Sequence, residues 1–423
     1  MLNCGGFKMK IIKLPNSFGV VLVLFLVSLA HGLPEKTVYA FGAPGIGDGM
    51  YPYCNLVFDA KGNVYGTTLD GGTYNAGIVY KLSPLGNGQW AETVLHEFTG
   101  QSDGGYPFAG LVFDSVGNLY GTGGYGGANG TGVVFELSPQ VSGWAYNVLY
   151  NFGAYPQSSD GFGPNSTLVL DKLGNLFGTT YEGGISGCFQ GCGTVFELSP
   201  TDSGGWKEQL IHAFQANGTD GELPTGGVTL GSNGELYGTT QNGGTSGSGI
   251  LYQLTYSSST NGWIETLVHQ FVGGTTDGSF PEAGVLIHAG HLYGTTDGGG
   301  TNGHGTVFET TFSKTTGWIT TILYSFGQSY SGDGISPQAG LTMDNKGNLY
   351  GTTSYGGAYN YYGTVFKVSK STNGTWSETV LHSFSGPDGF YPLAVVTIHN
   401  GWLYGTASNG GNNTGVVYQV HLI

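Results

Sequence analysis

Arginine is absent from this chain of 423 residues, and charged residues of either sign are scarce. Only 9% of the residues are charged, whereas about 25% is usual in soluble domains. The 27 acids outnumber the 12 basic residues, all of which are lysines. A negative surface without arginine repels phosphate backbones and anionic lipid headgroups, so the composition argues against nucleic acid as a partner.

Long segments with helical periodicity are also missing after residue 32, which predicts an all-β protein. Glycine accounts for 81 residues, far above the usual level of about 7%. No Gly-X-Y period accompanies the glycines, so a collagen-like structure is excluded. The aromatic fraction of 13% is too high for a disordered chain, so a packed fold is expected.

The first 32 residues are typical of a secretory signal peptide. Lys8, Lys10 and Lys13 precede an apolar run over residues 18–29, and Ala30 and Gly32 supply the small residues of a cleavage site. An uncleaved membrane anchor is the alternative, but the run is shorter than the roughly 20 residues that span a bilayer. Cleavage removes three lysines and no acid, so the net charge of −15 becomes −18. We expect an extracellular or periplasmic protein that is not inserted in a membrane after cleavage.

The four cysteines are consistent with export. Cys188 and Cys192 bracket one short loop, where an oxidised pair is the default in a secreted chain. Zinc is the rival interpretation, but no second ligand pair lies nearby at the usual spacing. Cys54 occupies a position that holds a small residue in every other repeat, which predicts a buried and unreactive thiol.

One phrase recurs seven times along the chain. Its first copy is Val64-Tyr65-Gly66-Thr67-Thr68, and successive copies lie about 56 residues apart. This period lies just above the roughly 40–50 residues of a β-propeller blade. The central aromatic residues are Tyr65, Tyr120, Phe177, Tyr237, Tyr293, Tyr350 and Tyr404.

Each repeat is predicted to contain four short strands. In the first repeat we expect them at residues 56–59, 64–68, 78–82 and 90–98, with a tight turn between the first two and a polar loop before the last. Six tryptophans each precede a phenylalanine by eight residues, as Trp90 precedes Phe98. The even spacing predicts that both side chains lie on one face of the fourth strand.

The seventh copy of the fourth strand lies at the N-terminal end of the predicted propeller. Residues 37–41 match residues 94–98 in type, and Leu33 lies eight residues before Phe41. Seven complete blades therefore form only if this N-terminal strand pairs with the C-terminal blade, because an open array would expose two unpaired sheet edges. We predict that residues 33–423 form a single seven-bladed β-propeller, with four antiparallel strands per blade.

The run from Leu341 to Phe366 resembles a known tandem repeat. Asp344, the segment 347–353 and the glycine pair at 356–357 carry the resemblance to the GloVer-type repeat of exported bacterial proteins. The resemblance extends over essentially all of residues 33–423. It implies export and tandem β-repeats, and it brings no catalytic residues or cofactor.

Asp-Gly-x-x-Pro precedes the first strand of every repeat, and turn chemistry explains it best. A ring of Ca²⁺ ligands is the functional alternative, but such a site needs 6–8 converging oxygens. Four histidines at one equivalent position of the fourth strand are interpreted as packing residues, because the symmetry places them far apart. The aspartates are Asp48, Asp103, Asp160, Asp220, Asp277, Asp333 and Asp388, and the histidines are His96, His212, His269 and His382.

Blade five contains three histidines: His288 and His291 flank one predicted hairpin turn, and the strand count places His304 on the opposite face. Two ligands are too few for a zinc site. No metal site and no cofactor is therefore expected.

The function is expected on the face of the propeller that carries the loops between blades and the loops between strands two and three, which we call the loop face. Aromatic side chains on a weakly charged surface suit stacking on sugar rings or contact with a protein. We therefore predict a secreted, monomeric binding or scaffold module for an extracellular glycan or protein. The expected binding residues are Tyr125, Tyr181, Tyr355, Tyr359, Tyr361 and Tyr362.

A hydrolase or lyase acting on polysaccharides is the alternative. Such an enzyme needs two carboxyl groups about 5–9.5 Å apart, and no hydrolase motif is present in the sequence. Convergence of acids from several blades in the central pocket would distinguish this alternative from a binding module. The candidate acids are Asp70, Glu182, Glu222, Glu282 and Asp297.

Overall fold

The computed structural model describes residues 35–42, 47–153, 159–184, 187–327, 332–359 and 361–422. The predicted signal peptide lies outside these ranges, as does Leu33. Every regular element within them is a β-strand. The described part of the chain accordingly contains no helix that could cross a membrane.

The strands form seven four-stranded antiparallel sheets, which are the blades of a propeller. In the first six blades, four strands follow one another from the axis outward. Blades one to three consist of β3 (Val57–Phe58), β4 (Val64–Thr68), β6 (Ile78–Gly86) and β7 (Gln89–Glu97); β8 (Val112–Phe113), β9 (Leu119–Gly123), β10 (Val133–Gln140) and β11 (Gly143–Asn151); and β12 (Val169–Leu170), β13 (Leu176–Thr180), β14 (Thr194–Pro200) and β15 (Trp206–Ala213).

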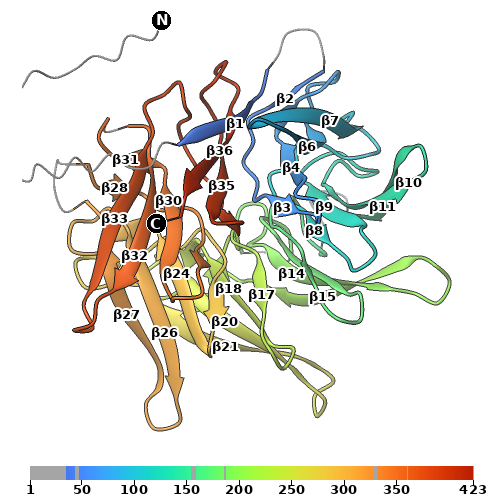
Figure 1. Cartoon of the computed structure of the whole chain (residues 1–423). Coiled ribbons are helices and arrows are strands. Elements are labelled where there is room, and N and C mark those ends of the chain that lie inside the picture. The colour runs from blue at the N-terminus through green and yellow to red at the C-terminus, as the bar shows by residue number, and fades with distance from the viewer. Residues whose placement is uncertain are drawn as a thin grey trace, which may run out of the picture. The chain divides into compact units, whose positions relative to one another are not determined.

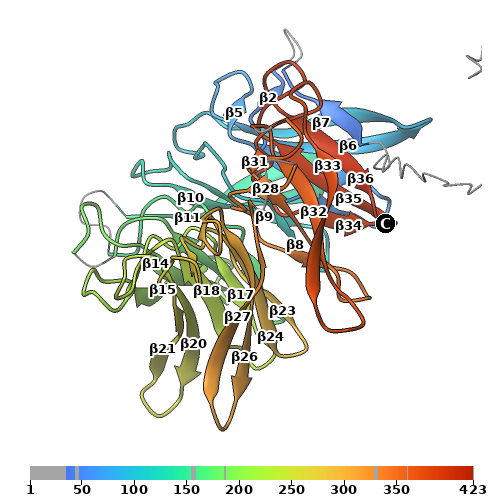
Figure 2. The ribbon, with the colours of Figure 1, turned by 90° about the vertical axis from the view of Figure 1, so that its left-hand side faces the viewer.

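Blades four to six repeat this order, and Figure 2 shows that the long outer hairpins of blades four and five project at the same end. These blades consist of β17 (Val228–Leu230), β18 (Leu236–Thr240), β20 (Ile250–Ser257) and β21 (Gly262–Gln270); β23 (Leu286–His288), β24 (His291–Thr296), β26 (Thr306–Ser313) and β27 (Gly317–Ser325); and β29 (Thr342–Met343), β30 (Leu349–Thr353), β32 (Thr364–Lys370) and β33 (Trp376–Ser383).

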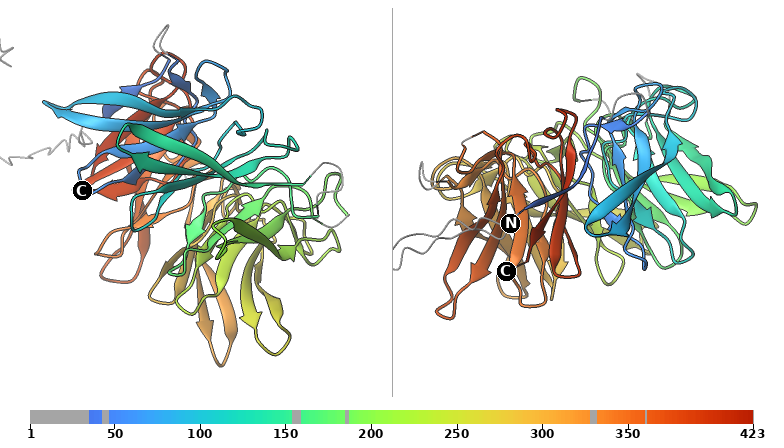
Figure 3. Two further views of the ribbon diagram at one scale, coloured as in Figure 1. Left: turned by 90° about the vertical axis from the view of Figure 1, so that its right-hand side faces the viewer. Right: turned by 45° about the horizontal axis from the view of Figure 1, so that its top comes forward.

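Blade seven closes the ring with strands from both ends of the chain. It consists of β34 (Thr397–His399), β35 (Trp402–Ala407), β36 (Val416–His421) and the N-terminal β1 (Lys36–Ala40), which pairs antiparallel with β36. Figures 1 and 3 show β1, in blue, beside the red C-terminal strands. Toward blade one, Thr406 Oγ1 donates a hydrogen bond to the Cys54 carbonyl at 3.0 Å, and Thr397 Oγ1 donates to the Leu56 carbonyl at 2.8 Å. The predicted closure is therefore confirmed.

The third strand is longer than the sequence predicted. It runs to Gly86 instead of ending at Leu82, and β7 begins at Gln89, so a tight hairpin replaces the expected polar loop. Pro84 faces Trp90 in this extension. The outer strand pair tolerates a proline and polar residues there because these positions are largely exposed.

The prediction that Trp90 and Phe98 share one face of the strand is wrong. Val79 faces His96 and Tyr80 faces Val94, so Leu95 is an extra residue in a β-bulge. A one-residue bulge reverses the alternation of side chains. Trp90 consequently packs between blades seven and one, whereas Phe98 packs between blades one and two. The same irregularity occurs in all seven outer strand pairs of the described chain.

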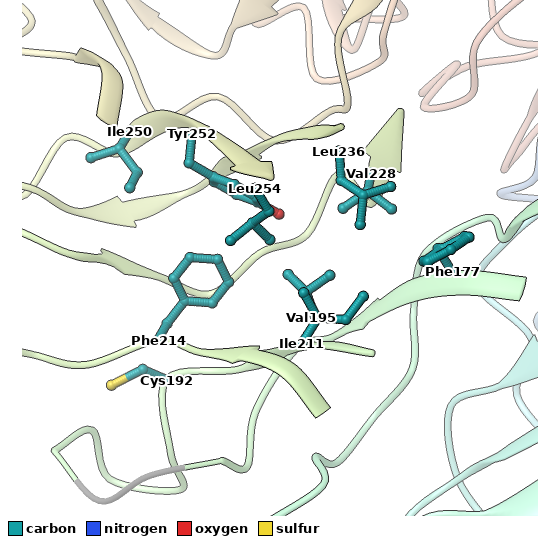
Figure 4. Close-up of a cluster of buried hydrophobic side chains, with 10 residues drawn as sticks. All are labelled: Phe177, Cys192, Val195, Ile211, Phe214, Val228, Leu236, Ile250, Tyr252 and Leu254. Atoms are coloured by element: carbon teal, nitrogen blue, oxygen red, sulfur yellow. The ribbon is translucent and has the colours of Figure 1, made fainter. Parts of the chain in front are cut away.

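Apolar cores fill the spaces between adjacent blades. Figure 4 shows the core between blades three and four, where Phe214 of blade three faces Tyr252 of blade four with ring centroids 5.1 Å apart. Near the axis, the threonine after the glycine of the second strand donates to a carbonyl of the next blade in six blades, as Thr67 does to Ala109 at 2.8 Å; in blade three, Thr179 Oγ1 has no hydrogen-bond partner among the described residues. Threonine is required there because it is small enough for the buried strand and still carries a donor.

A disulfide joins Cys188 to Cys192 on the loop of blade three, and Cys54 is buried as a free thiol whose pKa is raised by burial. Because the bridge closes a ring of only a few residues, it removes little entropy from the unfolded chain. We expect the double substitution C188A/C192A to lower the free energy of unfolding by at most about 2 kcal/mol. Urea denaturation of the variant beside the wild type measures this, and loss of the cooperative transition would contradict it.

Candidate functional site

The loop face carries a small pocket on the propeller axis. Its walls are the residues that follow the proline of each Asp-Gly-x-x-Pro loop, and its volume is about 150 Å³. The next residue of each loop, Cys54 in blade one, has a small side chain in every blade because neighbouring loops approach closely. In blade four, a Cβ on Gly226 would lie 2.2 Å from the carbonyl carbon of Ala283. The pocket-lining residue of each blade in turn is Tyr53, Phe108, Asn165, Thr225, Glu282, Gln338 and Leu393.

The two halves of this axial pocket differ in chemistry. Tyr53 and Phe108 lie on one side, with ring centroids 6.3 Å apart and Leu393 as their neighbour around the ring. Amide, hydroxyl and carboxyl groups of blades three to six form the other side. A pocket with one apolar wall and one hydrogen-bonding wall suits a ligand that has one apolar face and polar edges.

The carboxyl group of Glu282 is held in place by side chains of both neighbouring blades. Gln241 Nε2 donates a hydrogen bond to Glu282 Oε1 at 2.7 Å, and Ser354 Oγ donates to Gln338 Oε1 at 2.5 Å. Burial raises the pKa of Glu282 to about 7, and the charge of Asp297 adds to the increase, while hydrogen bonds from Gln241 and Gln338 oppose it. Glu282 can therefore exchange a proton near neutral pH.

Asp297 is brought beside Glu282 by the backbone. Phe280, two residues before Glu282, adopts a left-handed conformation with a φ of 57°, and its carbonyl accepts a hydrogen bond from the Asp297 amide at 3.0 Å. The Phe280 amide donates a hydrogen bond to the Ser248 carbonyl of the preceding blade at 2.8 Å. Burial raises the pKa of Asp297 as well. The two acids thus form a fixed pair whose proton affinity is higher than usual.

Two buried oxygens of the site have no hydrogen-bond donor. Asp297 Oδ1 and Asn165 Oδ1 are both inaccessible to solvent and unpaired. A buried acceptor without a donor costs roughly 1–3 kcal/mol, so a ligand that supplies donors would recover this free energy. Asn165 was not predicted as a binding residue from the sequence. Its place in the axial pocket follows from its position after a repeated proline, and that position was the available signal.

The six predicted tyrosines lie around the pocket but do not converge. Tyr355, Tyr359 and Tyr361 of blade six are exposed, as is Tyr125 of blade two. Tyr362 is half-buried against Phe390, with ring centroids 5.6 Å apart. Burial and the charges of Glu182 and Glu282 raise the pKa of Tyr181. The tyrosines therefore form two separate aromatic patches on the loop face.

Of the five candidate acids, the structure brings together only Glu282 and Asp297. Both belong to blade five, whereas the alternative assumed acids from several blades. Asp70 and Glu182 each have a pKa raised by burial, and Glu222 pairs with Asn242 between β16 (Gly221–Glu222) and β19 (Asn242–Gly243).

Equivalent short ladders stabilise the loop face in other blades. They pair the Asp-Gly loop with the glycine-rich loop. The strands are β2 (Gly49–Met50) with β5 (Asp70–Gly71), β22 (Gly278–Ser279) with β25 (Gly298–Gly299), and β28 (Gly334–Ile335) with β31 (Tyr355–Gly356).

A second pocket lies on the opposite face, between the hairpins of blades three and four, with a volume of about 590 Å³. Phe177 stands there where most blades have a tyrosine, so the hairpin Asp171 lacks the hydroxyl that Tyr65 donates to Asp59 in blade one. Its aromatic walls, Phe177 and Trp263, repeat the ordinary packing between blades. We favour the axial pocket because its residues depart from the repeat and include Glu282, whose pKa is raised by burial and by the charge of Asp297.

The chain belongs to the Gloeobacter/Verrucomicrobia repeat family, whose repeat matches residues 23–190 and 185–418. The family resemblance predicted from the sequence is therefore confirmed. A search of curated proteins found no significant match.

Solved structures match the chain at low sequence identity. An ancestral GH74 enzyme is 11% identical with a TM-score of 0.56, and the match covers 88% of this chain and 48% of that enzyme. The chain therefore spans about half the length of that enzyme. A sialidase from Trypanosoma rangeli is 14% identical with a TM-score of 0.41, over 81% of this chain and 57% of the sialidase. At these identities the likeness concerns the fold alone.

Proposed function

We propose that this protein is an exported binding module that recognises carbohydrate in the axial pocket of the loop face. The observation that carries the proposal is the division of the pocket into an aromatic wall, Tyr53 and Phe108, and a hydrogen-bonding wall that includes Asn165 and Glu282. A pyranose ring presents an apolar face and hydroxyl edges, so it requires both kinds of wall. The N-terminal signal-like segment supports export.

The size of the pocket limits what it can enclose. At about 150 Å³ it is smaller than the roughly 300–1,000 Å³ of pockets that bury drug-sized ligands. One terminal sugar fits this description, with the rest of the chain lying on the exposed face. Tyr181 of blade three, whose pKa is raised in part by the charge of Glu282, and the exposed Tyr125 of blade two are the side chains on which a second sugar would stack.

Binding measurements test this proposal. A glycan array identifies an oligosaccharide, and calorimetry then compares the wild type with N165A/E282Q and with the control Y256A, whose exposed tyrosine lies in the opposite-face pocket. The double substitution should weaken binding at least tenfold, because two hydrogen-bonding groups are removed, and Y256A should leave it unchanged. Equal affinity of the wild type and N165A/E282Q would contradict the axial site. Absence of glycan binding would leave an extracellular protein as the ligand.

A second candidate function is glycoside hydrolysis, which the pairing of Glu282 with Asp297 favours. A carboxyl whose pKa is about 7 remains largely protonated in mildly acidic medium and can act as a general acid beside an ionised partner. Release of reducing ends from the bound glycan, lost in both E282Q and D297N, would establish this activity. Binding without any release would exclude it for that glycan.

A further inference from the structure

A cluster of three polar side chains recurs at the outer end of the interfaces between blades. The first two members are the His or Tyr of the fourth strand of one blade and the Asp of the Asp-Gly-x-x-Pro loop that follows it. The third member lies on the fourth strand of the next blade, two residues after the repeated tryptophan or the residue equivalent to it. That last residue is glutamate at five interfaces, and Tyr146 and Thr320 occupy the other two. The glutamates are Glu35, Glu92, Glu208, Glu265 and Glu378.

Between blades three and four this cluster has the geometry of a metal site. His212 on β15 lies with Nε2 3.5 Å from Asp220 Oδ2 and 3.9 Å from Glu265 Oε2 on β21. All three ligand atoms lie within 4.8 Å of one another. In tetrahedral zinc sites with bonds of about 2.0–2.2 Å, neighbouring ligand atoms are roughly 3.3–3.5 Å apart, so a small contraction would complete the coordination.

Two of these side chains also present buried atoms without a partner. Nε2 of His212 and Oε1 of Glu265 are inaccessible to solvent and make no hydrogen bond. Asp220, by contrast, is fixed: the Gly221 amide donates to its Oδ1 at 2.7 Å and the Gln215 amide donates to its Oδ2 at 3.0 Å. An imidazole nitrogen and a carboxylate oxygen left unpaired beside a fixed carboxylate are the groups that a cation would satisfy.

Two interfaces have a histidine and an aspartate at the same positions but no glutamate, and they allow the His–Asp distances to be compared. His269 Nε2 lies 3.2 and 3.1 Å from the two carboxylate oxygens of Asp277, within hydrogen-bond distance. His96 lies 3.2 Å from Asp103 and stacks on Tyr146, with ring centroids 3.8 Å apart. At both interfaces the histidine is closed onto its aspartate. His212 Nε2 lies farther from its aspartate, 3.5 Å from Asp220 Oδ2.

We propose that His212, Asp220 and Glu265 bind one divalent transition-metal cation of the zinc type and thereby link blade three to blade four. One imidazole and two carboxylates suit zinc, with water completing the coordination. Calcium is disfavoured because it takes 6–8 oxygen ligands. The ion would neutralise charge in an interface that buries most of all three side chains. This site is independent of the axial pocket and of the proposed carbohydrate binding.

A second cluster of the same composition, formed by Glu35, His382 and Asp388, lies between blades six and seven. There His382 Nε2 lies 3.0 Å from Asp388 Oδ2, so the histidine already has a partner. Zinc would have to displace this hydrogen bond. We therefore expect the cluster at His212 to take the first equivalent of zinc.

Calorimetric titration of the metal-free full chain with zinc chloride tests the proposal. The wild type should bind zinc and melt at a higher temperature in its presence, because binding to the folded state alone stabilises that state. E265Q should bind the first equivalent at least tenfold more weakly and lose the zinc-dependent increase in Tm. H269Q, a histidine change at an interface that lacks the glutamate, should bind as the wild type does.

Three results would overturn the proposal. The first is the absence of zinc binding by the wild type. The second is equal zinc affinity of E265Q and the wild type, and the third is an equal zinc-dependent increase in Tm in E265Q and the wild type. The last two would place the ion elsewhere, for example at His382. Since glutamine preserves the size of Glu265 and removes charge repulsion with Asp220, E265Q is expected to fold, and its metal-free Tm verifies this.

Discussion

Deletion of residues 33–41 should abolish the cooperative unfolding transition or lower the free energy of unfolding by at least several kcal/mol. The deletion removes β1, exposes the whole edge of β36, and takes away Phe41 and Val38, both of which are buried. Burial of two such side chains alone contributes roughly 3–6 kcal/mol. The lost ladder and the open sheet edge add to this cost and favour aggregation.

Thermal and urea unfolding measure the effect. K36A is the matched control, because Lys36 lies on the same strand with an exposed side chain, and it should change stability by about 0.5 kcal/mol or less. A deletion variant that melts cooperatively at the wild-type temperature would show that β1 does not close the ring.

Stability should fall as the pH rises from about 4.5 to about 8. At four interfaces a glutamate of one blade lies near the Asp-Gly aspartate, and burial followed by the charge of that aspartate raises the pKa of the glutamate. The pKa rises from 4.5 to about 8 for Glu35, Glu92 and Glu378 and to about 7 for Glu208. The folded state therefore binds these protons more tightly than the unfolded state. Their stabilising contribution is complete below pH 4.5 and is lost as the pH passes the folded-state values.

Melting curves between pH 4.5 and 8.5 test this dependence. We expect the Tm of the wild type to fall by several degrees across this range, and the slope to flatten in E92Q/E208Q/E378Q. D202N, an exposed acid in the outer hairpin of blade three, is the control and should keep the wild-type slope. A Tm that rises with pH would contradict the assigned protonation of the interfaces.

Repetition made the fold predictable, because seven equivalent phrases report the same local structure. The number of blades and the identity of the closing strand were predicted by counting the repeats of the fourth strand, each of which ends in a phenylalanine equivalent to Phe98. The bulge at Leu95 could not be predicted in this way, since it leaves the spacing in the sequence unchanged and alters only the pairing. The error about Trp90 came from assuming regular alternation.

The candidate site was only partly predictable for a related reason. Side chains such as Tyr359 and Tyr361 stood out because they add aromatic residues to one loop, and they are exposed. The axial pocket instead takes one residue from each of seven loops that are far apart in the sequence. Glu282 and Asn165 become neighbours of one pocket only when the ring closes. Their convergence depends on the tertiary structure, which no local pattern reports.

The central claim is that the axial pocket binds a sugar, and a crystal structure with the oligosaccharide identified on the array tests it most directly. We predict a terminal sugar between the rings of Tyr53 and Phe108 and the polar groups of Asn165 and Glu282, with the next sugar toward Tyr181. A sugar bound only in the pocket lined by Phe177 and Trp263, with the axial pocket empty, would contradict the claim.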